Sequence, residues 1–105
     1  MPSRREKIEA MLVDEPDDIF LRYSLAMELD KEGDHEASLT RFDDLMAGDP
    51  PYVPAFFMSA QQLARLDRIE DARAKLRAGI DQARSQGDQH AAGEMSEMLA
   101  SLGGE

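Results

Sequence analysis

The residues that could carry acid–base or metal chemistry are few and widely separated in this sequence. Its two histidines, His35 and His90, lie 55 residues apart, and each follows an aspartate or stands close to an expected helix start. As metal ligands they would need a third protein ligand that converges with them in space. We therefore expect both histidines at the surface or in capping turns.

The acidic residues allow more than one interpretation. The run Asp14–Asp18, Asp-Glu-Pro-Asp-Asp, could bind a divalent cation or a basic partner. The simpler interpretation is a solvated turn whose acids cap the next helix. Asp43 and Asp44 are consecutive on an expected helix, where neighbouring side chains point about 100° apart. They are therefore expected to be solvated surface residues and no catalytic pair.

The sequence also contains no recognisable catalytic motif. It has no cysteine, no G-x-S-x-G, no H-E-x-x-H, no phosphate-binding glycine loop and no calcium loop. We expect the protein not to be an enzyme, and we expect no cofactor and no metal site.

Composition favours one small domain. The chain has 105 residues, of which 42% are hydrophobic and 32% are charged, with 22 acids against 12 bases and a net charge of −10. This charge argues against a nucleic-acid partner and against anionic membranes. No long apolar stretch and no secretory leader is visible, so we expect a cytoplasmic protein without a membrane partner. Residues 1–50 carry 14 acids and 6 bases, so the acidity is concentrated in the first half.

The elements that must position any site follow from an internal period. When the sequence is shifted by 34 residues, Ile8 falls on Phe42 and then on Leu76, and Tyr23 falls on Phe57. Apolar residues recur within each period at helical spacing, and the alternation typical of strands is absent. The pattern predicts six helices, at residues 3–13, 18–31, 35–47, 53–66, 69–85 and 88–102.

Turn and cap residues fit these helices. Gly33 and Gly87 suit the left-handed position that follows a helix. Asp34 and Asp88 are expected N-caps, and so is Asp17 or Asp18.

The period and its marker residues resemble those of the tetratricopeptide repeat family. The residues that carry the resemblance are Gly33-Asp34 at the turn between the two helices of a repeat, Ser38 and Ala72 at the small close-packing position, Phe42 and Leu76 at the large apolar position, and the closing Asp49-Pro50. Two departures are Arg22 in place of an aromatic residue and Asp67 in place of the turn glycine.

The resemblance implies an all-α fold. Six antiparallel helices would stack as helix-turn-helix hairpins into a right-handed superhelix, or solenoid. The single domain, residues 1–105, would divide into a half repeat at 4–17, full repeats at 18–51 and 52–86, a terminal capping helix at 87–102 and a tail at 103–105.

The resemblance also implies a concave groove lined by the first helix of each repeat. The residues expected on it are Phe20, Tyr23, Met27, Lys31, Phe57, Met58, Gln61, Arg65 and Met95. Tyr23 and Phe57 would be its aromatic anchors, and Lys31 and Arg65 would favour a ligand with some negative charge. Packing in the core is an equally good interpretation for Met95 and Met98. The asparagine and lysine clamp of some family members, which binds a partner's C-terminal carboxylates, is not supported by these residues.

The function that these expectations favour is that of an interaction module, which binds a peptide or a partner protein in the apolar groove. The alternative is a self-assembling structural subunit, a homodimer formed through the groove or the terminal helix.

Overall fold

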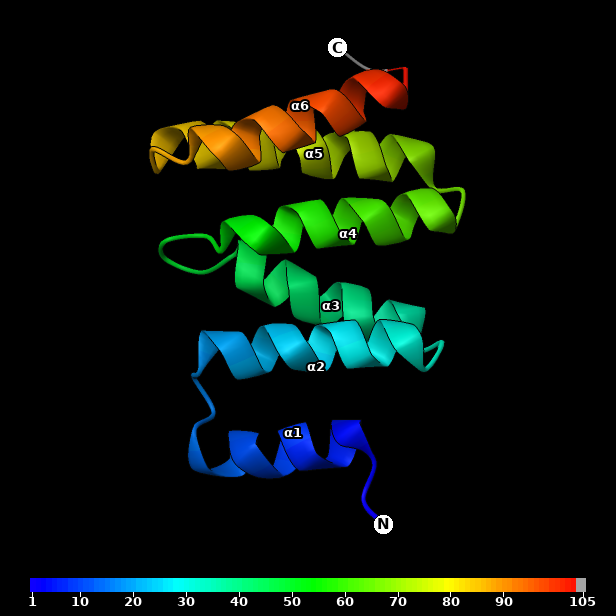
Figure 1. Ribbon diagram of the computed structural model, residues 1–105, viewed down its shortest axis with the longest axis vertical. Helices are drawn as coiled ribbons and strands as arrows, with labels where there is room; N and C mark the ends of the chain where they lie inside the picture. Colours follow the sequence, from blue (N-terminus) through cyan, green and yellow to red (C-terminus); the bar gives the residue numbers. More distant parts are fainter. Residues whose placement is uncertain (104–105) are drawn as a thin grey trace. The chain divides into compact units, whose positions relative to one another are not determined.

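The computed structural model describes residues 1–103, and within this part of the chain it contains six α-helices and no strand (Figure 1). Every helix begins and ends within one residue of its predicted bounds, so the predicted all-α fold is confirmed. The helices are α1 (Arg4–Asp14), α2 (Ile19–Lys31), α3 (His35–Met46), α4 (Val53–Arg65), α5 (Ile69–Ser85) and α6 (Gln89–Ser101).

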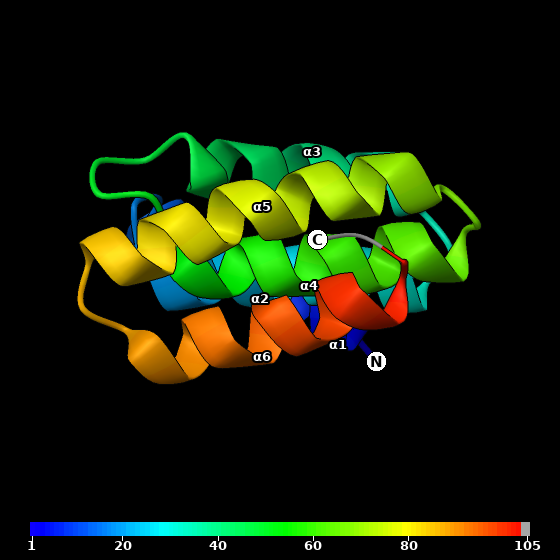
Figure 2. The same cartoon turned by 90° about the horizontal axis from the view of Figure 1, so that it is seen from above.

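The helices group into two compact units. The first, Met1–Gly48, contains α1, α2 and α3, and the second begins at Asp49 and contains α4, α5 and α6. Within each unit, consecutive helices pack against each other as antiparallel hairpins, and Figure 2 shows α6 alongside α5 in the second unit. The predicted repeat bounds and the single-domain organisation remain predictions.

The core of the first unit is built from the apolar stripe of α2. Leu25 and Leu29 are buried together with Ile8 of α1. On the other side of α2, the hydroxyl of Ser38 in α3 donates a hydrogen bond of 2.6 Å to the carbonyl oxygen of Ala26. Both residues are completely buried, so α2 and α3 approach closely where small residues were predicted.

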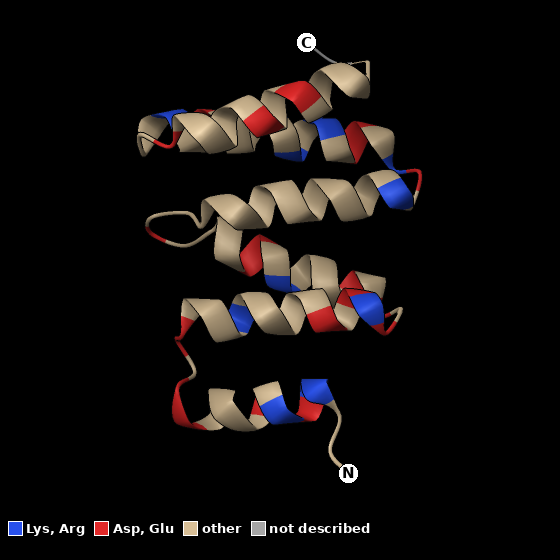
Figure 3. Ribbon diagram, in the orientation of Figure 1, with Lys and Arg blue, Asp and Glu red and all other residues tan. Residues whose placement is uncertain are grey.

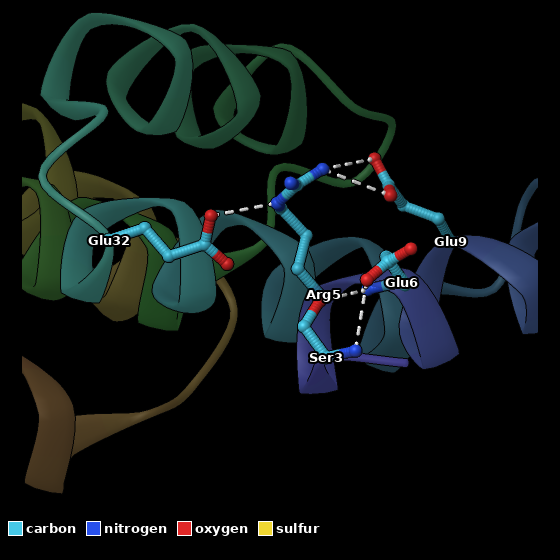
Figure 4. A network of polar contacts seen from close by, with 5 residues as sticks. All are labelled: Ser3, Arg5, Glu6, Glu9 and Glu32. Carbon is cyan, nitrogen blue, oxygen red and sulfur yellow. Dashed lines mark hydrogen bonds and ion pairs between the residues drawn. The ribbon is translucent and has the colours of Figure 1, made fainter. Parts of the chain in front are cut away.

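The start of α1 is fixed by polar contacts (Figure 4). Ser3 and Glu6 form a capping box, in which each side chain accepts from the other residue's backbone N–H. The bond from the backbone N–H of Ser3 is the main reason that the pKa of Glu6 is lowered. Arg5 Nε donates to Glu32 Oε1 at 2.8 Å, and its Nη1 lies 3.1 Å from Glu9 Oε1. The hydrogen bond to Glu32 is the main reason that the pKa of Arg5 is raised, and the negative charges of Glu32 and Glu9 raise it further.

The core of the second unit closes around a glycine. Gly79 of α5 is buried, and a Cβ atom built on it would lie 2.6 Å from Met95 Sδ and 2.6 Å from Phe56 Cβ. Because real Cβ atoms essentially never approach so closely, α4, α5 and α6 meet at a point that only glycine fits. Met95 is itself fully buried.

Three helices end in the same turn. After α2, the N–H of Asp34 donates to Leu29 O at 2.9 Å, and the N–H of Gly33 donates to Asp30 O at 3.0 Å. The same pair of bonds closes α4 and α5, as in a Schellman motif. The residue at the left-handed position is Gly33 (φ 86°), Asp67 (φ 61°) or Gly87 (φ 80°), so the predicted conformation of both glycines is confirmed.

The helix starts are less uniform than predicted. Asp18 accepts from the N–H of Leu21 at 2.9 Å, and Asp88 accepts from the N–H of Ala91 at 3.0 Å. Asp34 occupies the predicted N-cap position of α3, but its side chain makes no capping hydrogen bond.

The end of the described chain returns to α5. The carbonyl oxygen of Leu102 accepts a hydrogen bond of 3.0 Å from Arg73 Nε and a second bond from Arg73 Nη2. The predicted tail, 103–105, lies outside the described residues except for Gly103.

The left-handed turns predict opposite effects on thermal stability when glycine is replaced and when glycine is introduced. Gly33→Ala should lower the thermal midpoint by several degrees, because a Cβ at positive φ costs about 1–2 kcal/mol. Gly87→Ala should lower it less, because that turn precedes only the last helix. Asp67→Gly should raise the midpoint, because it relieves the same strain in α4's turn. Thermal unfolding followed by circular dichroism measures all three variants, and a neutral Gly33→Ala would contradict the assignment.

Candidate partner-binding surfaces

The predicted binding residues of the first unit lie along α2. Phe20 is 66% exposed, and Tyr23 and Met27, three and seven residues further on, are half-buried. Lys31 is exposed at the end of the same helix. Spacing of i, i+3 and i+7 places the three apolar side chains on one side of a helix. α2 therefore presents an apolar row with a basic end.

Tyr23 belongs partly to the core. Its ring packs edge-on against the buried ring of Phe42, with centroids 5.9 Å apart and an interplanar angle of 63°. Such an aromatic pair stabilises the fold by more than the free energy expected from the apolar area that it buries. Phe20, rather than Tyr23, is the more accessible aromatic side chain of this unit.

Phe20 also borders a hollow of about 210 Å³ between α1 and α2. Met11, which is 48% exposed, and Lys7 line the same hollow. Sequence reasoning missed Met11, because the 34-residue period drew attention to Ile8 on this helix instead. The apolar surface of the first unit thus extends from α2 onto α1.

The predicted residues of the second unit lie along α4. Phe57, Met58 and Gln61 are half-buried, and Arg65 is exposed. This helix carries no acidic residue, and Arg65 is its one charged side chain (Figure 3). α4 therefore offers a largely uncharged surface.

Between α4 and α6 lies a hollow of about 380 Å³ that includes two of these residues. Phe57 and Gln61 line it from α4, and Glu94, Glu97, Met98 and Ser101 line it from α6. Met98 is half-buried, and both glutamates are exposed. The hollow combines an aromatic ring and a methionine with two carboxylates.

Of the two interpretations left open for Met95, groove or core, the structure supports the core, so Met95 does not line this surface. Its side chain is fully buried against the Gly79 position. α4 begins 34 residues after α2, but α6 begins 36 residues after α4. α5 is five residues longer than α3, and the connection that follows it, residues 86–88, is three residues shorter than residues 47–52. Two extra residues turn a helix face by about 200°. The 34-residue period therefore assigned α6 the wrong face, and Asp88, the true N-cap, was the signal that would have corrected it.

The charges around these surfaces differ from the predicted ones. Lys31 Nζ lies 3.7 Å from Glu28 Oε1, so its charge is partly offset. On α6, His90 Nε2 lies 3.2 Å from Glu94 Oε1. Within the described chain, Glu94 and Glu97 are the two carboxylates that line the hollow between α4 and α6, and no basic residue lines it.

The remaining candidate residues lie at the surface. His35 Nδ1 lies 2.9 Å from Asp30 Oδ1, and Asp43 and Asp44 are exposed on α3. Within residues 1–103, no group of three or more histidine, cysteine, aspartate or glutamate side chains could hold a metal ion. None of the helices described is both long and apolar enough to cross a membrane.

Hairpins of antiparallel helices that follow a 34-residue period define a helical-repeat protein. Comparison with solved structures gives a more specific result. The chain is similar to a tetratricopeptide repeat domain protein from Salinibacter ruber, with 33% identity over 83% of this chain and 88% of that one and a TM-score of 0.77. It is also similar to a protein from Bordetella parapertussis, with 27% identity over 98% of this chain and 90% of that one and a TM-score of 0.82.

The chain belongs to the tetratricopeptide repeat family. No family model matches it, and no curated protein matches it either. The fold generally mediates interactions between proteins, which directs attention to the surfaces of α2 and α4.

Proposed function

We propose that this protein binds a partner protein through two apolar surfaces, one on α2 and one on α4. The observation that carries the proposal is the hollow between α4 and α6, in which Phe57 and Met98 face a ligand-sized space. Aromatic and methionine side chains supply large contact area and adapt to a peptide's shape. On α2, Phe20 offers a second anchor of the same kind.

The acidic edge of this hollow suggests the chemistry of the segment. Glu94 and Glu97 stand beside the apolar residues, and neither Phe57 nor Gln61 offsets their charge. Charge complementarity at an interface selects the partner and speeds association. We therefore propose an apolar side chain flanked by lysine or arginine as the ligand of the hollow, in place of the acidic ligand favoured by Lys31 and Arg65.

The test first uses the wild-type protein to capture a partner, which is then purified. The affinity of each variant for that partner is compared with the affinity of wild type. Phe20→Ala/Phe57→Ala should keep its helical circular dichroism and lose about thirtyfold in affinity, as truncated interface anchors do. Tyr23 is left intact because its ring packs on Phe42. Val13→Ala is the matched control, since Val13 is 81% exposed and lies outside the proposed surface.

A charge variant keeps the test decisive if the double variant does not fold. Glu97→Lys changes one exposed residue at the edge of the hollow and should weaken a basic ligand without disturbing the core. If the double variant folds and binds as tightly as wild type, the site lies elsewhere. If wild-type mass rises with concentration in light scattering and Phe20→Ala/Phe57→Ala abolishes the rise, the surface serves self-assembly instead.

A further inference from the structure

A second hollow of the same unit lies between α5 and α6 and has a different character. It measures about 460 Å³ and is lined by Arg77, Ile80, Asp81 and Arg84 of α5 and by Ser96, Leu99 and Ala100 of α6. α6 contributes different residues to this hollow than to the one it shares with α4. The two hollows therefore use separate faces of α6.

The shape of this hollow suits a helix. Ile80 and Leu99 form its apolar floor, with 7% and 5% of their surfaces exposed, and Ala100 is exposed beside them. A pair of packed antiparallel helices leaves a groove that accepts the ridge of a third helix. α6 already packs in this way against α4 and α5 (Figure 2).

The charge of the hollow is unusual for this acidic protein. Arg77 and Arg84 are exposed, and neither forms a hydrogen bond or a salt bridge with any residue between 1 and 103. They are seven residues apart, so their Cα atoms lie about 10 Å apart along one side of α5. Asp81 is the one acidic residue between them. The charge of Arg77 also attracts Glu70, whose pKa it helps to lower after the larger effect of Arg73. Because neither guanidinium is held by a hydrogen bond, both can bind a carboxylate in bidentate geometry.

We propose that this hollow docks an amphipathic helix of a partner protein that carries acidic side chains two turns apart. Apolar residues of that helix would cover Ile80, Leu99 and Ala100, and its carboxylates would pair with Arg77 and Arg84. The aliphatic stems of the two arginines would add to the apolar contact. The site is distinct from the surface of α2 and α4, and its ligand has the opposite charge.

The Met11 surface of a second copy of this chain fits the hollow less well. The exposed apolar residue Met11 of α1 shares its surroundings with Lys7 and Arg4. Docking α1 of another copy would therefore bring basic residues toward Arg77 and Arg84, and like charges at an interface are unfavourable.

The test uses a displayed library of helical peptides with a fixed leucine stripe. The positions that flank the stripe are randomised among glutamate, lysine, glutamine and serine, and the library is selected against the whole protein. The recovered peptides should be enriched in glutamate at flanking positions two turns apart. Their affinity should fall about tenfold or more for Arg77→Glu/Arg84→Glu and should weaken as salt increases.

Two controls distinguish a loss of binding at this hollow from a general effect of the protein's net charge. Lys7→Glu/Arg41→Glu changes the net charge by the same amount at exposed residues of the first unit and should bind like wild type. Ala100→Trp keeps both arginines, fills the hollow and should abolish binding. Phe57→Ala should leave these peptides unaffected, so the failure of either proposed site can be recognised separately.

Three outcomes would overturn the proposal. The first is a selection that yields no binder, or only binders without an excess of glutamate. Binders whose affinity is unchanged in both Arg77→Glu/Arg84→Glu and Ala100→Trp would bind elsewhere. Self-association that Arg77→Glu/Arg84→Glu abolishes would make a second copy the occupant of the hollow.

Discussion

Gly79→Ala should destabilise the protein by about 1–3 kcal/mol, although alanine is the better helix former. The new methyl carbon would lie 2.6 Å from Met95 Sδ and 2.6 Å from Phe56 Cβ. Met95 has flexible torsions and can move, but Phe56 Cβ is tied directly to the backbone of α4. α4 and α5 must therefore separate, and this loss of packing exceeds the gain in helix propensity.

Gly93→Ala is the matched control. Gly93 lies within α6, is exposed, and has no atom within 4 Å of the position that its Cβ would take. Here helix propensity acts alone, so this substitution should stabilise the protein by up to about 1 kcal/mol. Urea denaturation of both variants measures the difference. Equal stabilisation by the two alanines would show that the helices do not meet closely at Gly79.

Ala72→Leu should also destabilise the protein by about 1–3 kcal/mol, because it adds three carbon atoms at a site without any exposed surface. Ala72 stands one period after Ser38, whose hydroxyl lies 2.6 Å from the backbone of α2. We therefore expect a similarly close approach of α5 to α4, and a leucine there would force these helices apart.

The control lies two residues further along the same helix. Ala74 is exposed, so Ala74→Leu changes helix propensity and volume without crowding the core. Its denaturation midpoint should remain close to that of wild type. Equal midpoints for the two leucine variants would contradict the assigned repeat register.

The helices and turns could be predicted from the sequence because their causes are local. A 34-residue period, apolar residues at helical spacing and Gly33 and Gly87 at the turns determine where helices begin and end. The close approach at Ser38 could also be predicted, because the small residue recurs one period later as Ala72.

The 34-residue period did not predict the face of α6, because that face depends on the lengths of the segments that precede it. The longer α5 and the shorter connection after it together move the start of α6 by two residues relative to the period, and this shift places Met95 in the core. The same shift brings Glu94 and Glu97 to the hollow beside Phe57. The groups near Arg77 and Arg84 depend on the packing of α5 against α6, and only a three-dimensional structure contains that information.

The way in which α1 is attached has a consequence for the motions of the first unit. Ile8 is its one buried side chain, and its other ties to α2 include the ion pairs of Arg4 with Glu28 and of Arg5 with Glu32. Ion pairs at a protein surface contribute little free energy and weaken in salt. α1 should therefore open at a lower free energy than the hairpin of α2 and α3, as a separate cooperative segment. Each opening would bring Leu25 and Leu29 into transient contact with water, so the ionic strength of the solution controls how often this part of the core becomes accessible.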